Sequence, residues 1–311
     1  MTVPPPLPPI PLAAMTDPGA DWLLAQLRDV LDLTGRATLR RLDPAFWQPR
    51  PGSVFAAELA NTEVDVHGAP WGPQEPTMVF EMAQLSLVAV EDFLTAIRKL
   101  LEPPFPPYVP KYGAAALCRS VLESAANAFW LTDPQLTVRQ RVARTYLVLW
   151  DEHNTAVKNA TKALAAKALT AQEVATARAD RDALLTRIDD LGLGYTKKPR
   201  TVGGEALPTK TEKVTALLAG EVRAVHDVVY SLYSGFAHGD MTSILASRLG
   251  TGWTITPRQL TQDVEMAVAA VGILQERLCL GGMGSSPREA ANWFWQHNAG
   301  RRLRAVRDRL A

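Results

Sequence analysis

Cysteine is scarce in this sequence, and so are long uninterrupted runs of apolar residues. Among the 311 residues there are two cysteines, Cys118 and Cys279, each within an apolar helical pattern and without a CxxC partner. This argues against a disulfide framework or a zinc-finger set, so we expect two reduced core thiols. No apolar run approaches the roughly 20 residues of a membrane-spanning helix. We therefore expect a cytoplasmic protein without membrane partners.

The sequence also lacks an overall excess of either charge. Its 33 Lys and Arg residues against 32 Asp and Glu residues give a formal net charge of +1. Any affinity for nucleic acid must therefore come from a local patch. One such patch is the flexible loop expected at 192–208, in which Lys197, Lys198 and Arg200 are candidate binding residues. Another is the Arg-rich segment 284–311.

Internal repeats and strand–helix alternation are absent, whereas apolar residues recur at helical spacing along most of the chain. This pattern predicts an all-α bundle of seven or eight helices, with one short β-hairpin as an option near 243–256. The expected organisation is a Pro-rich tail (1–18), a helical domain (19–283) with a helical hairpin projecting at about 137–191, and a basic C-terminal helix (284–311). The main helices are expected at 21–41, 78–101, 112–131, 137–167, 170–191, from 209 to about 241, at 257–280 and at 287–310, with a short one near 54–61.

The segment EVRAVHDVVYSLYSGFAHGDM, at 221–241, puts a row of polar groups on an otherwise apolar helix. Asp227, Ser234 and His238 fall within about 60° of one another on the helical wheel, with Tyr230 at the border of the row. A glycine ends the helix directly after His238, where exposed carbonyls favour a protonated imidazole. His238 is therefore the candidate acid–base residue, and the other three are candidate binding residues.

A second polar row lies on the alanine-rich helix expected at 112–131. Arg119, Glu123 and Asn127 follow one another at intervals of four residues, so they share one side of the helix. Two interpretations stay open. Arg119 and Glu123 satisfy each other and fix the packing of the helices, or Arg119 binds a phosphate while Glu123 orients it. Arg144, on the next helix, is the other candidate for a phosphate-binding arginine.

Some well-known sites fit the sequence less well. The segment 204–211 has the length of a phosphate-binding loop, but a threonine replaces its second glycine and no strand precedes it. The expected helices also lack the Glu-x-x-His pairs of a di-iron bundle. His226 and Asp227, with His153 and Asp263, resemble the metal set of HD-type phosphohydrolases, which we keep as a third hypothesis. Beyond this, the sequence predicts neither a metal site nor a cofactor.

Three segments together resemble the HEPN-like helical superfamily, over roughly residues 78–280. They are CRSVLESAANAFWL, RQRVARTYLVLWDEH and YSLYSGFAHGD. The resemblance implies an all-α fold and, in active members, metal-independent RNA cleavage by a paired arginine and histidine, commonly at a dimer interface. His238 matches the histidine, but Ser234 stands where the arginine is expected. Arg119 or Arg144 would then have to supply the guanidinium from a neighbouring helix.

The sequence thus leaves two main hypotheses. The first is a HEPN-like protein that acts on RNA or a nucleotide, as a diverged ribonuclease with His238 as the acid–base residue and as a homodimer. The second is a non-catalytic helical interaction or scaffold protein. The first requires His238 and an arginine to converge in an open cleft, whereas the second buries them against protein partners.

Overall fold

A computed structural model describes residues 18–41, 43–60, 63–102, 111–219 and 257–283, together with Leu303. Within this part the all-α prediction is confirmed, with one small antiparallel sheet added. The helices are α1 (Pro18–Arg41), the 3-10 helix η1 (Pro44–Trp47), α2 (Val54–Leu59), α3 (Gln74–Leu100), α4 (Lys111–Leu131), α5 (Val138–Ala165), α6 (Ala171–Asp190), α7 (Lys210–Leu218) and α10 (Pro257–Gly281). The strands are β1 (Tyr195–Lys197), β2 (Arg200–Val202) and β3 (Glu205–Ala206).

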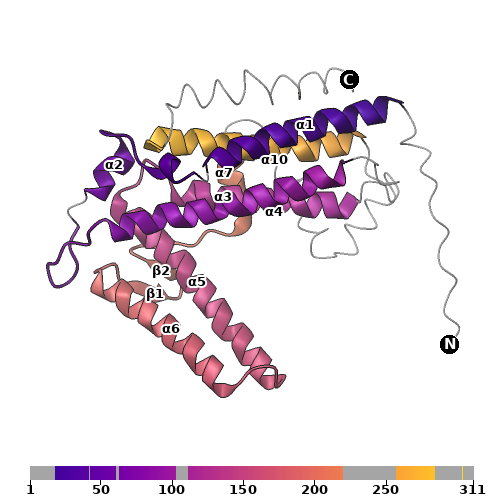
Figure 1. Cartoon of the computed structure of the whole chain (residues 1–311). Helices are drawn as coiled ribbons and strands as arrows, with labels where there is room; N and C mark the ends of the chain where they lie inside the picture. The colour runs from indigo at the N-terminus through magenta and orange to yellow at the C-terminus, as the bar shows by residue number, and fades with distance from the viewer. Residues whose placement is uncertain are drawn as a thin grey trace, which may run out of the picture.

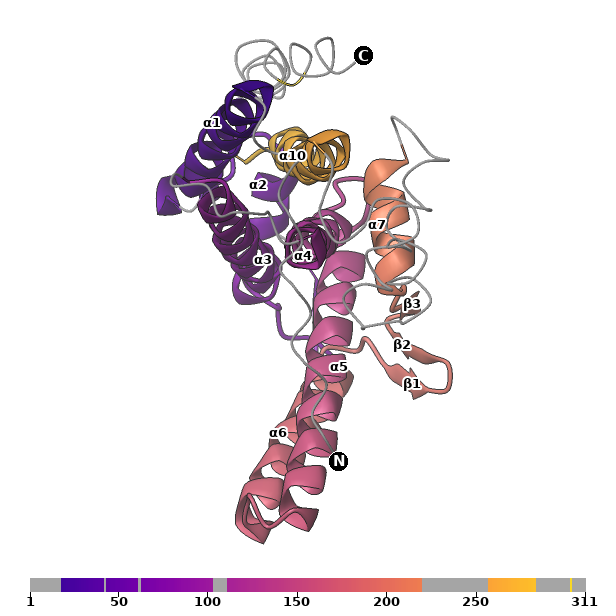
Figure 2. The same ribbon diagram turned by 90° about the vertical axis from the view of Figure 1, so that its right-hand side faces the viewer.

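The helix α4 is the centre of the bundle. It packs against α3, α10 and α7, and both views show it between them (Figures 1 and 2). Its alanines let these neighbours approach closely, because a methyl side chain takes little room between helices. The buried ones are Ala114, Ala115, Ala125, Ala126 and Ala128. The main core therefore surrounds α4, and α1 covers α3 and α10.

The segment from η1 through α2 packs on the C-terminal end of α10. Arg50 N donates a hydrogen bond to Gly282 O at 3.0 Å, and its Nη2 donates to Cys279 O, also at 3.0 Å. The buried ring of Phe55 lies against Gly281, where a Cβ atom would come within 2.1 Å of Phe55 Cε2. A glycine at this point is therefore what allows Phe55 to enter the core.

The helices α5 and α6 form an antiparallel hairpin that extends away from the bundle (Figures 1 and 2). Each begins with a capping box, in which a threonine and the residue three positions later satisfy each other's backbone N–H groups. The pairs are Thr137 with Gln140 and Thr170 with Glu173. These signals fix where the two helices begin.

A buried carboxylate, Glu75 at the start of α3, ties this hairpin to the bundle. Tyr146 Oη of α5 donates to Glu75 Oε2 at 2.9 Å, and Arg187 of α6 pairs with Oε1. Burial and the nearby negative charge raise the pKa of Tyr146, and the hydrogen bond to Glu75 raises the pKa of Arg187. Because a buried charge needs such partners, the three side chains fix the relative positions of α3, α5 and α6.

Residues 195–206 form a three-stranded sheet, which corrects the expectation of a flexible loop there. Tyr195 pairs with Val202, and Val202 pairs with Glu205. Gly203 and Gly204 have φ values of +57° and +81° and make the two-residue turn between β2 and β3. The fully buried Val202 joins the apolar residues of α5, so the sheet is held on that helix.

Several predicted elements lie outside the described residues. They are the Pro-rich segment before residue 18, the polar row at 221–241, the optional β-hairpin at 243–256 and most of the C-terminal basic helix. Leu303 is described, and it is buried in the main core. Among the described helices, none combines the length and the apolarity needed to cross a membrane.

Candidate functional site

Six of the ten side chains predicted for a site are described. They are Arg119, Glu123, Arg144, Lys197, Lys198 and Arg200. The others, Asp227, Tyr230, Ser234 and His238, lie outside the described residues. The pairing of His238 with an arginine therefore remains a hypothesis, whereas the surroundings of both arginines are defined.

Arg119 and Glu123 form the ion pair that their spacing on α4 allows. Arg119 Nε lies 2.5 Å from Glu123 Oε1, and the arginine side chain is 10% exposed. The second carboxylate oxygen, Oε2, accepts a hydrogen bond from Lys210 Nζ at 2.6 Å. Glu123 therefore links α4 to the first turn of α7.

Arg144 lies where α4, α5 and β3 meet. Its Nε donates to Glu205 Oε2 at 2.8 Å, and its Nη1 donates at 2.8 Å to the backbone oxygen of Trp130 in the last turn of α4. Its guanidinium carbon is 4.9 Å from the centroid of the Trp130 ring, which is within cation–π range. Gln140 Nε2 donates to the other oxygen of Glu205 at 3.2 Å. Arg144 is thus positioned by a carboxylate, a carbonyl and an aromatic ring.

Lys213 of α7 completes this group, and sequence reasoning missed it. Its Nζ donates to Asn127 Oδ1 at 2.8 Å and lies 4.3 Å from the centroid of the Trp130 ring. Lys213 and Arg144 therefore share one aromatic neighbour. We call the side chains of Arg119, Glu123, Asn127, Trp130, Arg144, Glu205, Lys210 and Lys213 the cationic cluster.

The amine of Lys213 is a poorly neutralised charge. In the described part of the chain no carboxylate lies within ion-pair distance of it. Burial lowers the pKa of Lys213 to about 8; the negative Asp151 opposes this shift, whereas the positive Arg144 and Lys210 add to it. An anion bound beside this amine would relieve both the burial cost and the repulsion.

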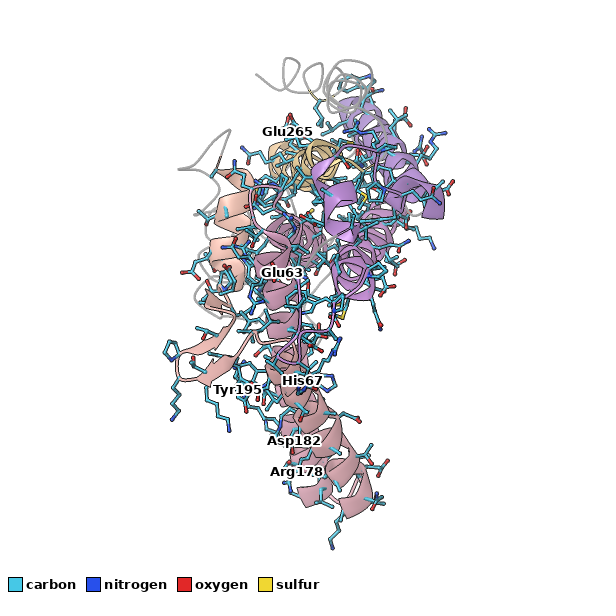
Figure 3. All side chains as sticks on the ribbon, turned by 90° about the vertical axis from the view of Figure 1, so that its left-hand side faces the viewer. Glu63, His67, Arg178, Asp182, Tyr195 and Glu265 are labelled. Atoms are coloured by element: carbon cyan, nitrogen blue, oxygen red, sulfur yellow. The ribbon has the colours of Figure 1, made fainter. Side chains whose placement is uncertain are left out.

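The β1–β2 hairpin carries the three basic residues that the sequence singled out here, and only one of them is in contact with α5. Lys197 and Lys198 are exposed at the end of β1, whereas Arg200 pairs with Asp151 of α5. Figure 3 shows Tyr195 of β1 beside this helix. The two lysines are therefore the sheet residues with charges most open to a ligand.

The arrangement suits anion binding better than the predicted catalytic pair. Arg119 and Arg144 each face a carboxylate of the protein, as the non-catalytic hypothesis expects of them. An ammonium group carries three donors, and Asn127 takes one from Lys213. A phosphate oxygen is a suitable acceptor for the remaining donors because charge-assisted hydrogen bonds are the strongest of their kind.

One sequence signal could have pointed to Lys213. Thr209 and Glu212 make the capping box that fixes the start of α7, which places Lys210 and Lys213 one turn apart on one side of the helix. Asn127 continues the polar row of α4 by one further turn. What the periodicity does not specify is that α7 packs on this side of α4.

The described residues do not support the hypothesis of a metal site. His226 and Asp227 lie outside them. Asp263, on α10, is 2% exposed; burial and, to a lesser extent, the charge of Asp263 raise the pKa of Cys118. His153 is on α5, which does not pack extensively against α10. Over the described ranges, no three metal-ligating side chains gather at one point.

No protein-family model, curated protein or solved structure matches this chain. Helical bundles support many unrelated functions, so the fold by itself selects none of them. The chemistry of the cationic cluster therefore has to carry the functional argument.

Proposed function

We propose that this protein binds RNA or a nucleotide by holding a phosphate group in the cationic cluster. The observation that carries the proposal is Lys213, a half-buried amine beside Arg144, with Asn127 as its hydrogen-bond partner. A partly buried cation without a carboxylate partner loses hydration, and an anion that binds beside it offsets this cost. A phosphate supplies that charge together with several acceptor oxygens.

The exposed lysines of the sheet support the same reading. Lys197 and Lys198 would meet further phosphates of a chain whose first phosphate lies at Lys213, which favours RNA over a single nucleotide. Contacts with phosphates release counterions, so the affinity should fall as salt is raised. The resemblance to the HEPN-like superfamily points to the same class of ligand.

Binding without cleavage is the form of the proposal that fits the two arginines. Arg119 would stabilise a reacting phosphate only with a guanidinium that Glu123 already partly neutralises, or after leaving Glu123, with which it forms a short and largely buried pair. Breaking such a pair leaves an uncompensated charge. Cleavage with His238 as the acid–base residue is the stronger claim and needs its own assay.

The binding test compares two lysine variants by fluorescence anisotropy with a labelled single-stranded RNA. Lys213→Met should weaken binding by about tenfold, the value of one charge-assisted hydrogen bond. Lys162→Met, the same change at an exposed position near the end of α5, should leave binding unchanged. Equal loss in both variants would show general charge attraction only and would contradict the proposal.

Two further measurements separate the alternatives. Incubation of the RNA with the protein and with His238→Ala, without metal, tests cleavage: products formed only by the unaltered protein would establish the ribonuclease form. If the protein neither binds nor cleaves RNA or nucleotides, the helical interaction or scaffold protein becomes the conclusion. The homodimer that the resemblance implies is tested separately by light scattering.

A further inference from the structure

Lys213 differs from the other lysines in its burial. Of the lysines whose side chains the structure describes, Lys213 alone is partly buried, and the others are exposed. It lies on α7, which packs on α4. Its Nζ donates to Asn127 Oδ1 at 2.8 Å and is 4.3 Å from the centroid of the Trp130 ring. The amine therefore has a defined position, whereas an exposed lysine amine samples many.

The surroundings of this amine favour its neutral form. Burial lowers the pKa of Lys213 to about 8, the positive Arg144 and Lys210 act in the same direction, and the negative Asp151 opposes them. A neutral amine has a free electron pair and is a nucleophile, whereas an ammonium group is not. At about pH 7.5, a pKa of about 8 leaves roughly a quarter of the amine neutral, against roughly 0.1% at an ordinary lysine pKa. The fold thus makes a nucleophile of this lysine.

We propose that Lys213 is a site of N-acylation by small acyl phosphates. In this step, Nζ attacks the carbonyl carbon of the donor and forms the C–N bond of an amide. The bond from that carbon to the phosphate oxygen breaks, inorganic phosphate leaves with the electron pair, and the amine gives one proton to water. The inference goes beyond the proposed function, because acylation does not require that the protein bind RNA.

The product suits this position better than the ammonium group does. An amide carries no charge, so it has less hydration to lose and is not repelled by Arg144 and Lys210. Its N–H can still donate to Asn127 Oδ1, although the cation–π contact with Trp130 is lost. If the cationic cluster binds RNA as proposed, acylation removes the charge on which that binding depends.

Reaction of the folded protein with acetyl phosphate, followed by peptide mass spectrometry, tests the inference. After the reaction, isotope-labelled acetic anhydride in guanidinium chloride modifies the lysines that are still free, so the light-to-heavy ratio gives the extent of reaction at each one. At about pH 7.5, Lys213 should react about tenfold faster than the exposed Lys162. Its larger neutral fraction gives an advantage of more than about a hundredfold, and its lower basicity takes back part of this because a less basic nucleophile attacks more slowly. Lys162 is the matched control within the same molecule.

Two conditions show whether the fold causes the preference. In the chain unfolded with guanidinium chloride, Lys213 and Lys162 should react at equal rates. At about pH 10 the preference should disappear in the folded protein too, because an ordinary lysine amine is then also neutral to a large extent. Equal rates in the folded protein at about pH 7.5, or a preference that persists after unfolding, would overturn the inference.

The effect on binding is measured separately, by fluorescence anisotropy with the labelled RNA. Lys213→Gln, whose uncharged amide stands for the acylated side chain, should bind about tenfold more weakly than the unaltered protein. Lys162→Gln should bind as the unaltered protein does. If the unaltered protein does not bind the RNA, the proposed function fails, whereas the mass spectra still decide whether Lys213 is an acylation site.

Discussion

The partly buried amine of Lys213 makes stability depend on pH in a way that one substitution removes. Its pKa is about 8 in the folded chain against an ordinary value of 10.5. Between these two values the unfolded chain binds more protons than the folded one, so the free energy of unfolding rises with pH. From about pH 7 to about pH 9.5 the rise due to this group is roughly 2 kcal/mol. Lys213→Met has no proton to bind and should lack this part of the rise.

Urea unfolding followed by tryptophan fluorescence measures the effect. Other groups titrate over the same range, so the informative quantity is the difference in unfolding free energy between the unaltered protein and Lys213→Met. At about pH 7 the variant loses a hydrogen bond to Asn127 but is spared a buried charge, so we expect it to be at least as stable. Toward about pH 9.5 the difference should shift by roughly 2 kcal/mol in favour of the unaltered protein. Parallel curves over the whole range would refute the reasoning, and Lys162→Met should give parallel curves as the control.

Two further predictions concern the fold. Gly281→Ala places a methyl group against the ring of Phe55 and should lower the free energy of unfolding by about 1–3 kcal/mol in urea. The matched change Gly35→Ala, where the nearest atom would be 3.6 Å from the new Cβ, should be neutral or stabilising by up to about 1 kcal/mol; equal losses would contradict the packing argument. Glu75→Gln leaves Tyr146 a hydrogen-bond partner but removes the charge that pairs with Arg187. We expect the free energy of unfolding to fall by roughly 1–3 kcal/mol, a moderate loss because Arg187 is partly exposed. An unchanged urea midpoint would show that this carboxylate does not hold the helical hairpin in place.

Most of the fold follows from local signals. The helical periodicity and the capping threonines predict the helices within a few residues, as for α5, expected at 137–167 and found at Val138–Ala165. The sheet at 195–206 was missed because its strands have only two or three residues, too few to show an alternating pattern. Its signals are the Gly203–Gly204 turn and the apolar Val202, which is buried only because α5 lies beneath it.

In the candidate site, too, contacts within one helix could be predicted, whereas contacts between distant segments could not. The Arg119–Glu123 pair could be predicted because both residues lie on one helix, four positions apart. The partners of Arg144 could not be predicted, because Glu205 is 61 residues away along the chain and reaches it through a sheet that the pattern did not show. Lys213 was missed for a related reason: its importance comes from α7 packing on α4, and its neighbours come from three different elements.

The internal pairs of the two arginines bear differently on the two functional hypotheses. For a catalyst, a guanidinium already bound by a carboxylate is a loss, because the charge it should give to the transition state is partly cancelled beforehand. For a binding protein, the same carboxylate lowers the affinity for any anion, because its repulsion grows with the charge of the ligand. Glu205 has this effect at Arg144, whereas Lys213 has no carboxylate of the described residues within ion-pair distance. The pairing that argues against cleavage at Arg144 therefore leaves Lys213 as the main charge available to a bound anion.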